Sequence, residues 1–184
     1  LPLLLVWLLS PVIAWALSQP VTPRRAEVDE NDRATLRRIA RRTWRYFETF
    51  AGDEDHGLAP DNAQELPALT IAHRTSPTNI GLGMLATLAA WDLGYVPARA
   101  LIERTRKALD TIDGLAEHEG HLLNWYDSQS RAPLHPRYVS TVDSGNLCGA
   151  LPTLPAGLCR AAQDSGDNAR RAGLADTLAL AGQN

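Results

Sequence analysis

The chain has 184 residues, of which 45% are hydrophobic and 21% charged, the ordinary balance of a domain with a buried core. Its formal net charge of −3 does not indicate the clustered basic surface that a nucleic-acid partner requires, so none is expected. Cys148 and Cys159 are too few for a disulfide framework and lack the spacing of a zinc pair. Because His118 and His121 have no third ligand nearby, we predict neither a metal site nor a cofactor.

The first 17 residues, LPLLLVWLLSPVIAWAL, contain no charge. About 20 such residues cross a bilayer core as a helix, and the sequence begins inside the run without a methionine, so we expect an upstream portion. Eight arginines between Arg24 and Arg45 follow, the pattern of a cytoplasmic membrane flank. We therefore predict a transmembrane helix over residues 1–18, with the rest facing the cytoplasm. A signal-peptide segment and a buried core helix are the alternatives.

Residues 19–30 hold prolines and charges without periodicity, which predicts a linker. Apolar residues at three- and four-residue spacing then predict a helix from Asn31 to Phe50, with its arginines on a solvated face. The core-facing stripe would comprise Leu36, Ile39, Ala40, Thr43, Phe47 and Phe50. Glycines and prolines predict an irregular loop over residues 51–75.

Two helices of different character follow. Ser76 and Pro77 are typical of an N-cap and a first helical position, and Gly94 is typical of a helix stop. The segment between them is apolar on nearly every face, which predicts a buried inner helix. The next helix, opened by Pro97, is amphipathic and therefore an outer one. Inner and outer helices joined by polar loops predict a mainly α fold, a partial (α/α) toroid.

The last third of the chain gives weaker signals. Another helix is expected near Ser144, and Pro152 and Pro155 should break it within about two turns. Residues 161–184 show only a weak helical pattern. We therefore assign residues 31–160 to the partial toroid and residues 161–184 to a poorly defined tail.

Four polar clusters carry the candidate chemistry: DNAQE at 61–65, HRTSPTN at 73–79, NWYD at 124–127 and RYVSTVDSGN at 137–146. Sugars require planar hydrogen-bonding side chains beside aromatic platforms, for which Trp125, Tyr126 and Tyr138 are candidates. Glycoside chemistry requires two carboxylates. The available ones are Asp61, Glu65, Asp127 and Asp143. The alternative reading is that such residues are helix caps, turns and core.

The segments RRTWRYFETF, HGLAPDNAQE, HRTSPTNIG, NWYD and PRYVSTVDSGNL resemble the cyclic β-1,2-glucan synthases, in the glycoamylase-like domain that follows their membrane-embedded glycosyltransferase region. The similarity runs from about Leu8 to Leu151. It implies an (α/α) toroid at the bacterial inner membrane. It also implies that the parent enzyme polymerises glucose from UDP-glucose and closes the ring, this region acting in chain transfer and cyclisation.

The resemblance also implies a glucan-binding face, to which we add Tyr126 and Arg137 from the polar clusters. The expected substrate-binding residues are Arg74, Asn79, Asn124, Trp125, Tyr126, Asp127, Arg137, Asp143 and Asn146. The catalytic acid and base are expected outside this region, which leaves the four carboxylates as weak candidates. The expected partners are a β-1,2-glucan chain, the lipid bilayer and the remaining domains of the synthase. A stand-alone hydrolase of β-1,2-glucan and a noncatalytic glucan-binding remnant are the alternatives.

Overall fold

The computed structural model describes residues 2–19, 28–164 and 166–182, and the chain forms two compact units, Leu1–Arg33 and Ala34–Asn184. Helix α1 (Pro2–Leu17) is the apolar segment and contains Pro11. Across the part of the chain that is described, no helix is both long enough and apolar enough to cross a membrane. Most of the predicted linker, residues 20–27, lies outside the described residues.

Helix α2 (Glu30–Phe50) buries a different face from the one predicted. Trp44 is 3% exposed and Arg41 is 8% exposed, whereas Leu36 and Ile39 are exposed. The reason is that two other side chains bind the Arg41 guanidinium. Its Nη2 donates to Glu48 at 3.0 Å and its Nε donates to the hydroxyl of Thr177 at 2.9 Å. The arginine face of α2 is therefore partly a packing face, because its buried charge is compensated.

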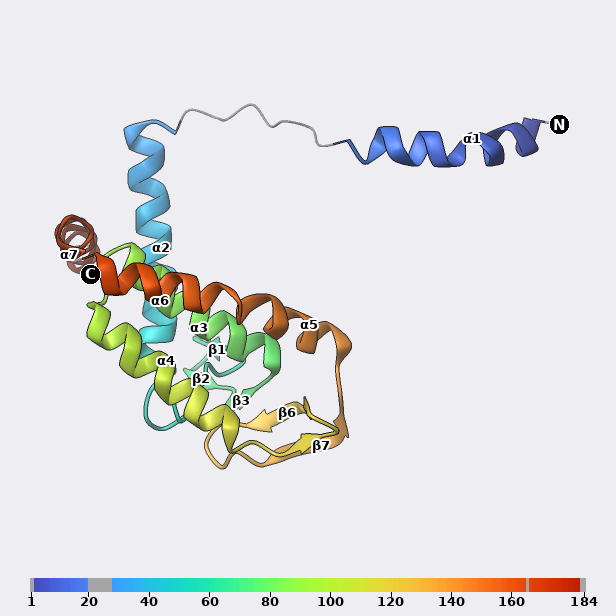
Figure 1. Cartoon of the computed structure of the whole chain (residues 1–184). Helices are drawn as coiled ribbons and strands as arrows, with labels where there is room; N and C mark the ends of the chain where they lie inside the picture. Colours follow the sequence, from blue (N-terminus) through green and yellow to red (C-terminus); the bar gives the residue numbers. More distant parts are fainter. Residues whose placement is uncertain (1, 20–27, 165, 183–184) are drawn as a thin grey trace. The chain divides into compact units, whose positions relative to one another are not determined.

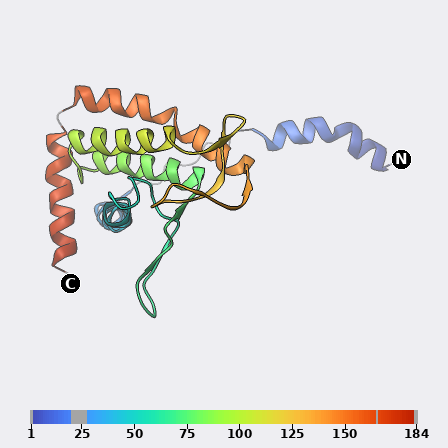
Figure 2. The same cartoon turned by 90° about the horizontal axis from the view of Figure 1, so that it is seen from below.

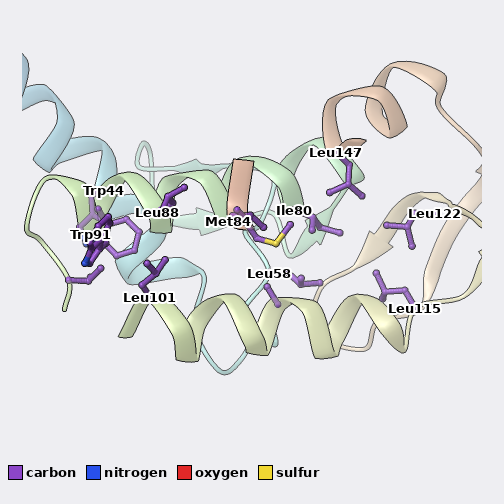
Figure 3. Packing of buried hydrophobic residues seen from close by; sticks show 14 of the residues in the cluster. Trp44, Leu58, Ile80, Met84, Leu88, Trp91, Leu101, Leu115, Leu122 and Leu147 are labelled. Atoms are coloured by element: carbon purple, nitrogen blue, oxygen red, sulfur yellow. The ribbon is translucent and has the colours of Figure 1, made fainter. Parts of the chain in front are cut away.

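Helix α3 (Pro77–Asp92) is the buried inner helix, as predicted. It packs against α4 (Ala98–Asp113) and the later helices α5 (Thr141–Ala150) and α6 (Thr153–Gln163) (Figure 1). The Ser76 hydroxyl accepts the Asn79 backbone N–H at 3.4 Å, and Gly94 follows the helix with φ +83°. Figure 3 shows the core that surrounds α3. The members labelled there are Trp44, Leu58, Ile80, Met84, Leu88, Trp91, Leu101, Leu115, Leu122 and Leu147. The mainly helical prediction is confirmed.

Short antiparallel strands lie in the loops between the helices. Strands β1 (Ala63–Gln64) and β2 (Thr70–Ile71) form a hairpin, which extends away from the helices in Figure 2. Strands β4 (Glu117–His118) and β5 (His121–Leu122) form a second pair. Strands β3 (Arg74–Thr75), β6 (Asn124–Asp127) and β7 (Pro133–Tyr138) form a sheet in the order β3-β6-β7. This sheet brings residues about 50 positions apart in sequence to the start of α3.

Three helices complete the described chain: α5 (Thr141–Ala150), α6 (Thr153–Gln163) and α7 (Asp167–Ala181). Helix α5 begins earlier than predicted because Ser140 caps it, its hydroxyl accepting the Asp143 backbone N–H at 3.2 Å. Pro152 and Pro155 do interrupt the helical run, but Pro155 lies in the first turn of α6, where a backbone N–H is not needed. The segment predicted as a poorly defined tail thus holds the end of α6 and all of α7.

Helix α7 approaches the turn after α3 backbone to backbone. A Cβ added at Gly173 would lie 2.3 Å from the carbonyl oxygen of Gly94. Beside this contact Arg37 of α2 forms a 2.7 Å ion pair with Asp176. The hydroxyl of Tyr95 lies 3.2 Å from an oxygen of the same carboxylate. Two glycines and a polar cluster therefore hold α7, and neither produces an apolar periodicity that sequence inspection can detect.

Candidate functional site

Several polar residues singled out in the sequence gather around the first turn of α3. Arg74 lies on β3, immediately before the Ser76 cap, and its backbone pairs with Asp127 of β6. Asp61 lies in the loop that precedes β1, and its backbone N–H donates to the carbonyl of Ala72 at 3.1 Å. These local pairings bring side chains from three separate loops to one helix end.

The side chain of Arg74 is held on two sides. Its Nε and Nη2 donate to one oxygen of Asp61 at 3.1 and 2.8 Å. Its guanidinium carbon lies 5.1 Å from the ring centroid of Trp125, a cation–π contact. Asn79, from the first turn of α3, lies 3.4 Å from the other oxygen of Asp61. We call Asp61, Arg74, Asn79 and Trp125 the arginine cluster.

A second group of side chains joins α5 to the same end of α3. Ser140 donates to the carboxylate of Asp143 at 2.5 Å. The hydroxyls of Ser76 and Thr78 are close enough to this carboxylate to lower its pKa. Asn146 donates to the Thr78 hydroxyl at 3.0 Å. Since Thr78 and Asn79 are consecutive, Asp143 and Asn146 lie next to the arginine cluster. Arg74, Trp125 and Asp143, predicted to share one surface, are therefore brought together.

The electrostatics of Asp127 and Asp143 favour their ionised forms. The backbone N–H and hydroxyl of Ser130 hold the pKa of Asp127 below its usual value, with a smaller contribution from the Gln129 N–H. For Asp143, burial raises the pKa, but the hydroxyls of Ser140, Thr78 and Ser76 together lower it below its usual value. Because a general acid must hold a proton near neutral pH, neither carboxylate suits that role.

Four residues predicted to bind substrate belong neither to the arginine cluster nor to the Asp143 group. Tyr126 is 0% exposed, and its hydroxyl donates to the Ala116 carbonyl at 2.6 Å, so its side chain lies in the interior and not on the surface. Asn124 is 2% exposed, and its side-chain amide donates to the Tyr138 hydroxyl, so it lies beneath the surface. Asp127 stabilises the turn that joins β6 to β7. Arg137 forms no ion pair with any residue in the described ranges and is exposed on β7.

Glu65 is also separate from the arginine cluster. It is exposed near the tip of the β1–β2 hairpin and lines a pocket on the side of α2. Of the four candidate carboxylates, Asp61 and Asp143 therefore lie at the start of α3. Within residues 2–19, 28–164 and 166–182, no group of three or more metal-binding side chains is found.

One buried polar group was missed in the sequence. The Asp55 side chain is 3% exposed, and its oxygens lie 2.9 and 3.1 Å from Nδ1 of His73. The hydroxyl of Ser128, itself fully buried, donates to the same carboxylate. Asp55 thereby joins the loop after α2, the residue before β3 and the residue after β6. These residues are 18 and 73 positions apart from Asp55, so no local spacing reveals the contact.

Comparison with known proteins shows that most of this region matches one protein family. Residues 38–144 match the family described as "Protein of unknown function (DUF3131)", which covers more than half of the chain. The chain belongs to this family. The DUF3131 region includes the arginine cluster, Asp55 and Asp143, so the residues that meet at the start of α3 lie within the matched segment.

The chain is also 45% identical over 161 residues to the cyclic beta-(1,2)-glucan synthase NdvB of Rhizobium meliloti (strain 1021). This similarity covers 87% of the chain and confirms the resemblance described above. It covers only 6% of the length of that synthase. The DUF3131 chain therefore corresponds to a small part of a much longer relative.

Among solved structures, the chain is similar to a crystal structure of a candidate glucoamylase from Bacteroides fragilis NCTC 9343, with a TM-score of 0.58. The match covers 80% of this chain and 37% of that protein at 21% sequence identity. At this identity the likeness concerns the fold alone. It supports a glucoamylase-like helical architecture and carries no information about the reaction.

Proposed function

We propose that this chain is the glucan-binding region of a cyclic β-1,2-glucan synthase and holds the growing chain during transfer and ring closure. The observation that carries the proposal is the arginine cluster, in which Asp61 fixes the Arg74 guanidinium against the ring of Trp125. A preorganised planar donor beside an aromatic ring and a side-chain amide matches the hydroxyls and C–H face of a glucose unit. The identity to the synthase indicates which glucan to test.

The electrostatics support binding rather than bond cleavage by the described residues. Asp127 and Asp143 have lowered pKa values, and Asp61 is occupied by Arg74 and by Asn79. Glycosidic bond cleavage requires a carboxylic acid that donates a proton to the leaving oxygen. We therefore propose that another region of the synthase supplies this acid. UDP-glucose chemistry is likewise assigned to another region.

Tryptophan fluorescence provides the test, because Trp125 is the partly exposed tryptophan of the second unit, whereas Trp44 and Trp91 are buried. Trp7 and Trp15 of α1 are replaced by phenylalanine to remove their background. The full chain is kept in a detergent without a sugar headgroup, since α1 is apolar. β-1,2-Glucooligosaccharides are then titrated, and a saturable change in emission is expected.

The chain offers a matched control for Arg74. Arg160 also lies over a tryptophan, 5.5 Å from the ring centroid of Trp91, and is also paired with an aspartate, Asp92. Arg74→Ala should weaken binding by at least about tenfold, the loss of about 1.4 kcal/mol of hydrogen bonding to a charged donor. Arg160→Ala should bind like the parent. Equal affinities for the two variants, or no binding by a folded parent, would contradict the proposal.

We also propose that residues 1–18 attach the region to the bacterial inner membrane, with the second unit in the cytoplasm beside the remaining domains of the synthase. The support is compositional: the 16 residues of α1 carry no charge and span about 24 Å at 1.5 Å per residue. Vesicle flotation tests this directly. Leu5→Asp combined with Leu9→Asp should abolish flotation, and flotation of this variant at the parental level would refute the attachment.

A further inference from the structure

A pocket of about 650 Å³ lies between α2 and the β1–β2 hairpin, separate from the arginine cluster. One wall is a single face of α2, formed by Arg42, Arg45, Tyr46 and Thr49 at positions i, i+3, i+4 and i+7. The facing wall is the hairpin, which contributes Glu65 and neighbouring apolar residues. We call this pocket the hairpin groove. Leu180 of α7 completes the lining of the groove.

The charged side chains of the hairpin groove are unpaired. Among the described residues Arg42, Arg45 and Glu65 form no ion pair or hydrogen bond with another side chain. Elsewhere on the same helix, Arg37 and Arg41 each form an ion pair with a carboxylate. Unpaired guanidinium and carboxylate groups at a pocket wall keep their donors and acceptors available to a ligand.

The composition of the groove fits a neutral sugar better than an anion. Tyr46 and Phe50 contribute aromatic rings that contact one another edge to face, with centroids 5.3 Å apart. Guanidinium donors, a carboxylate acceptor and aromatic rings together match the vicinal hydroxyls and the C–H face of a pyranose. A site selected for an anion would not place Glu65 opposite the two arginines, because like charges repel.

Tyr46 connects the hairpin groove to the arginine cluster. The Tyr46 hydroxyl donates to the carbonyl of Pro60 at 2.8 Å, and Asp61 of the arginine cluster is the next residue. Burial, then the nearby charges of Asp61 and Asp55, raises the pKa of Tyr46. The four residue-to-residue steps from Asp61 to Glu65 span at most about 13 Å of extended chain, a distance that a short oligosaccharide can bridge.

We propose that the hairpin groove is a second carbohydrate subsite, which binds glucose units of the same glucan chain that the arginine cluster holds. This inference rests on the proposed function, because it takes the occupant of the arginine cluster to be a glucan. The groove binds the units beyond those in contact with Arg74 and Trp125. A longer oligosaccharide therefore gains affinity that a short one does not.

The experiment measures the affinity of the full chain for β-1,2-glucooligosaccharides of increasing length, in the detergent described above and at fixed salt. Affinity is expected to rise with length in the parent. The double variant Arg42→Ala/Arg45→Ala should bind the shortest oligosaccharides like the parent and the longest ones at least about tenfold more weakly. Glu65→Gln, which keeps the shape of the side chain, should reduce the same length dependence.

A control removes two exposed arginines that do not line the groove, Arg38→Ala/Arg171→Ala, and should retain the parental length dependence. If the groove variant behaves like this control at every length while Arg74→Ala still weakens binding, the hairpin groove is not a subsite and the proposed function stands. If no oligosaccharide binds to the folded parent, the proposed function fails as well. Circular dichroism of each variant establishes that the helices are intact.

Discussion

Gly173→Ala should displace α7 from its packing position, because the added methyl group meets backbone atoms rather than a movable side chain. The new Cβ would lie 2.3 Å from the carbonyl oxygen of Gly94 and 3.0 Å from that of Leu93. Relief of this overlap requires α7 to move away from the turn after α3. The movement would also lengthen the ion pair between Arg37 and Asp176, now 2.7 Å.

The expected size follows from two opposing contributions. Overpacking costs about 1–3 kcal/mol and a weakened charged hydrogen bond a further 1–2, whereas alanine in a helix interior is favoured over glycine by about 1 kcal/mol. The free energy of unfolding should therefore fall by about 1–4 kcal/mol. For a unit of this size the melting temperature should fall by about 2–4 °C for each kcal/mol.

The matched control is Gly149→Ala in α5, where a Cβ would meet no atom within 4 Å. This variant should be more stable than the parent by about 0.5–1 kcal/mol, since only the helix preference changes. Thermal unfolding of the three proteins, followed by far-ultraviolet circular dichroism, compares them under one condition. If Gly173→Ala melts at or above the temperature of Gly149→Ala, α7 does not pack on the Gly94 turn as described.

Two further substitutions test interactions elsewhere in the second unit. Asp55→Ala should lower the free energy of unfolding, measured in urea, by about 2–4 kcal/mol, because His73 and Ser128 lose their buried partner. The control Asp53→Ala removes an exposed ion pair and should leave the urea midpoint nearly unchanged. Similar midpoints for the two variants would refute the role of Asp55. Burial, then the charge of Asp176, raises the pKa of Tyr95 to about 12, so the folded chain retains the Tyr95 proton at a pH where the unfolded chain has lost it. Stability should therefore fall as the pH rises from 10 to 12, and melting curves of Tyr95→Phe should show a shallower decline; an unchanged slope would exclude this tyrosine as the cause.

The inner helix was predictable because all of its signals are local. Ser76 and Pro77 lie at its start and Gly94 follows its end, and each of these residues acts through its own backbone conformation. The buried face of α2 was not predictable in the same way. Arg41 is buried only because Glu48 and Thr177 bond it, and Thr177 is 136 positions away. A periodicity argument assigns an arginine to solvent unless its partner is known.

The candidate site was predictable in its residue types and only partly in its geometry. Sequence reasoning placed Arg74, Trp125 and Asp143 in polar loops, whereas the structure has them on β3, on β6 and in the first turn of α5. It could not decide which of two neighbours on a strand faces inward. Since successive side chains on β6 point to opposite faces, one of Trp125 and Tyr126 had to face inward. Tyr126 is the buried one, because its hydroxyl donates to the Ala116 carbonyl and accepts the Leu123 backbone N–H.

The carboxylate of Asp55 also bears on how the chain acquires its structure during synthesis. Ser128 is made 73 residues after Asp55, and His73 is made 18 residues after it. At ribosomal rates of about 5–20 residues per second, Ser128 is therefore synthesised several seconds after Asp55. The loop that follows α2 can therefore bury Asp55 in its native position only after Ser128, the residue after β6, has been synthesised. At this end of the domain, an early part of the chain thus reaches its final position only once a later part is available.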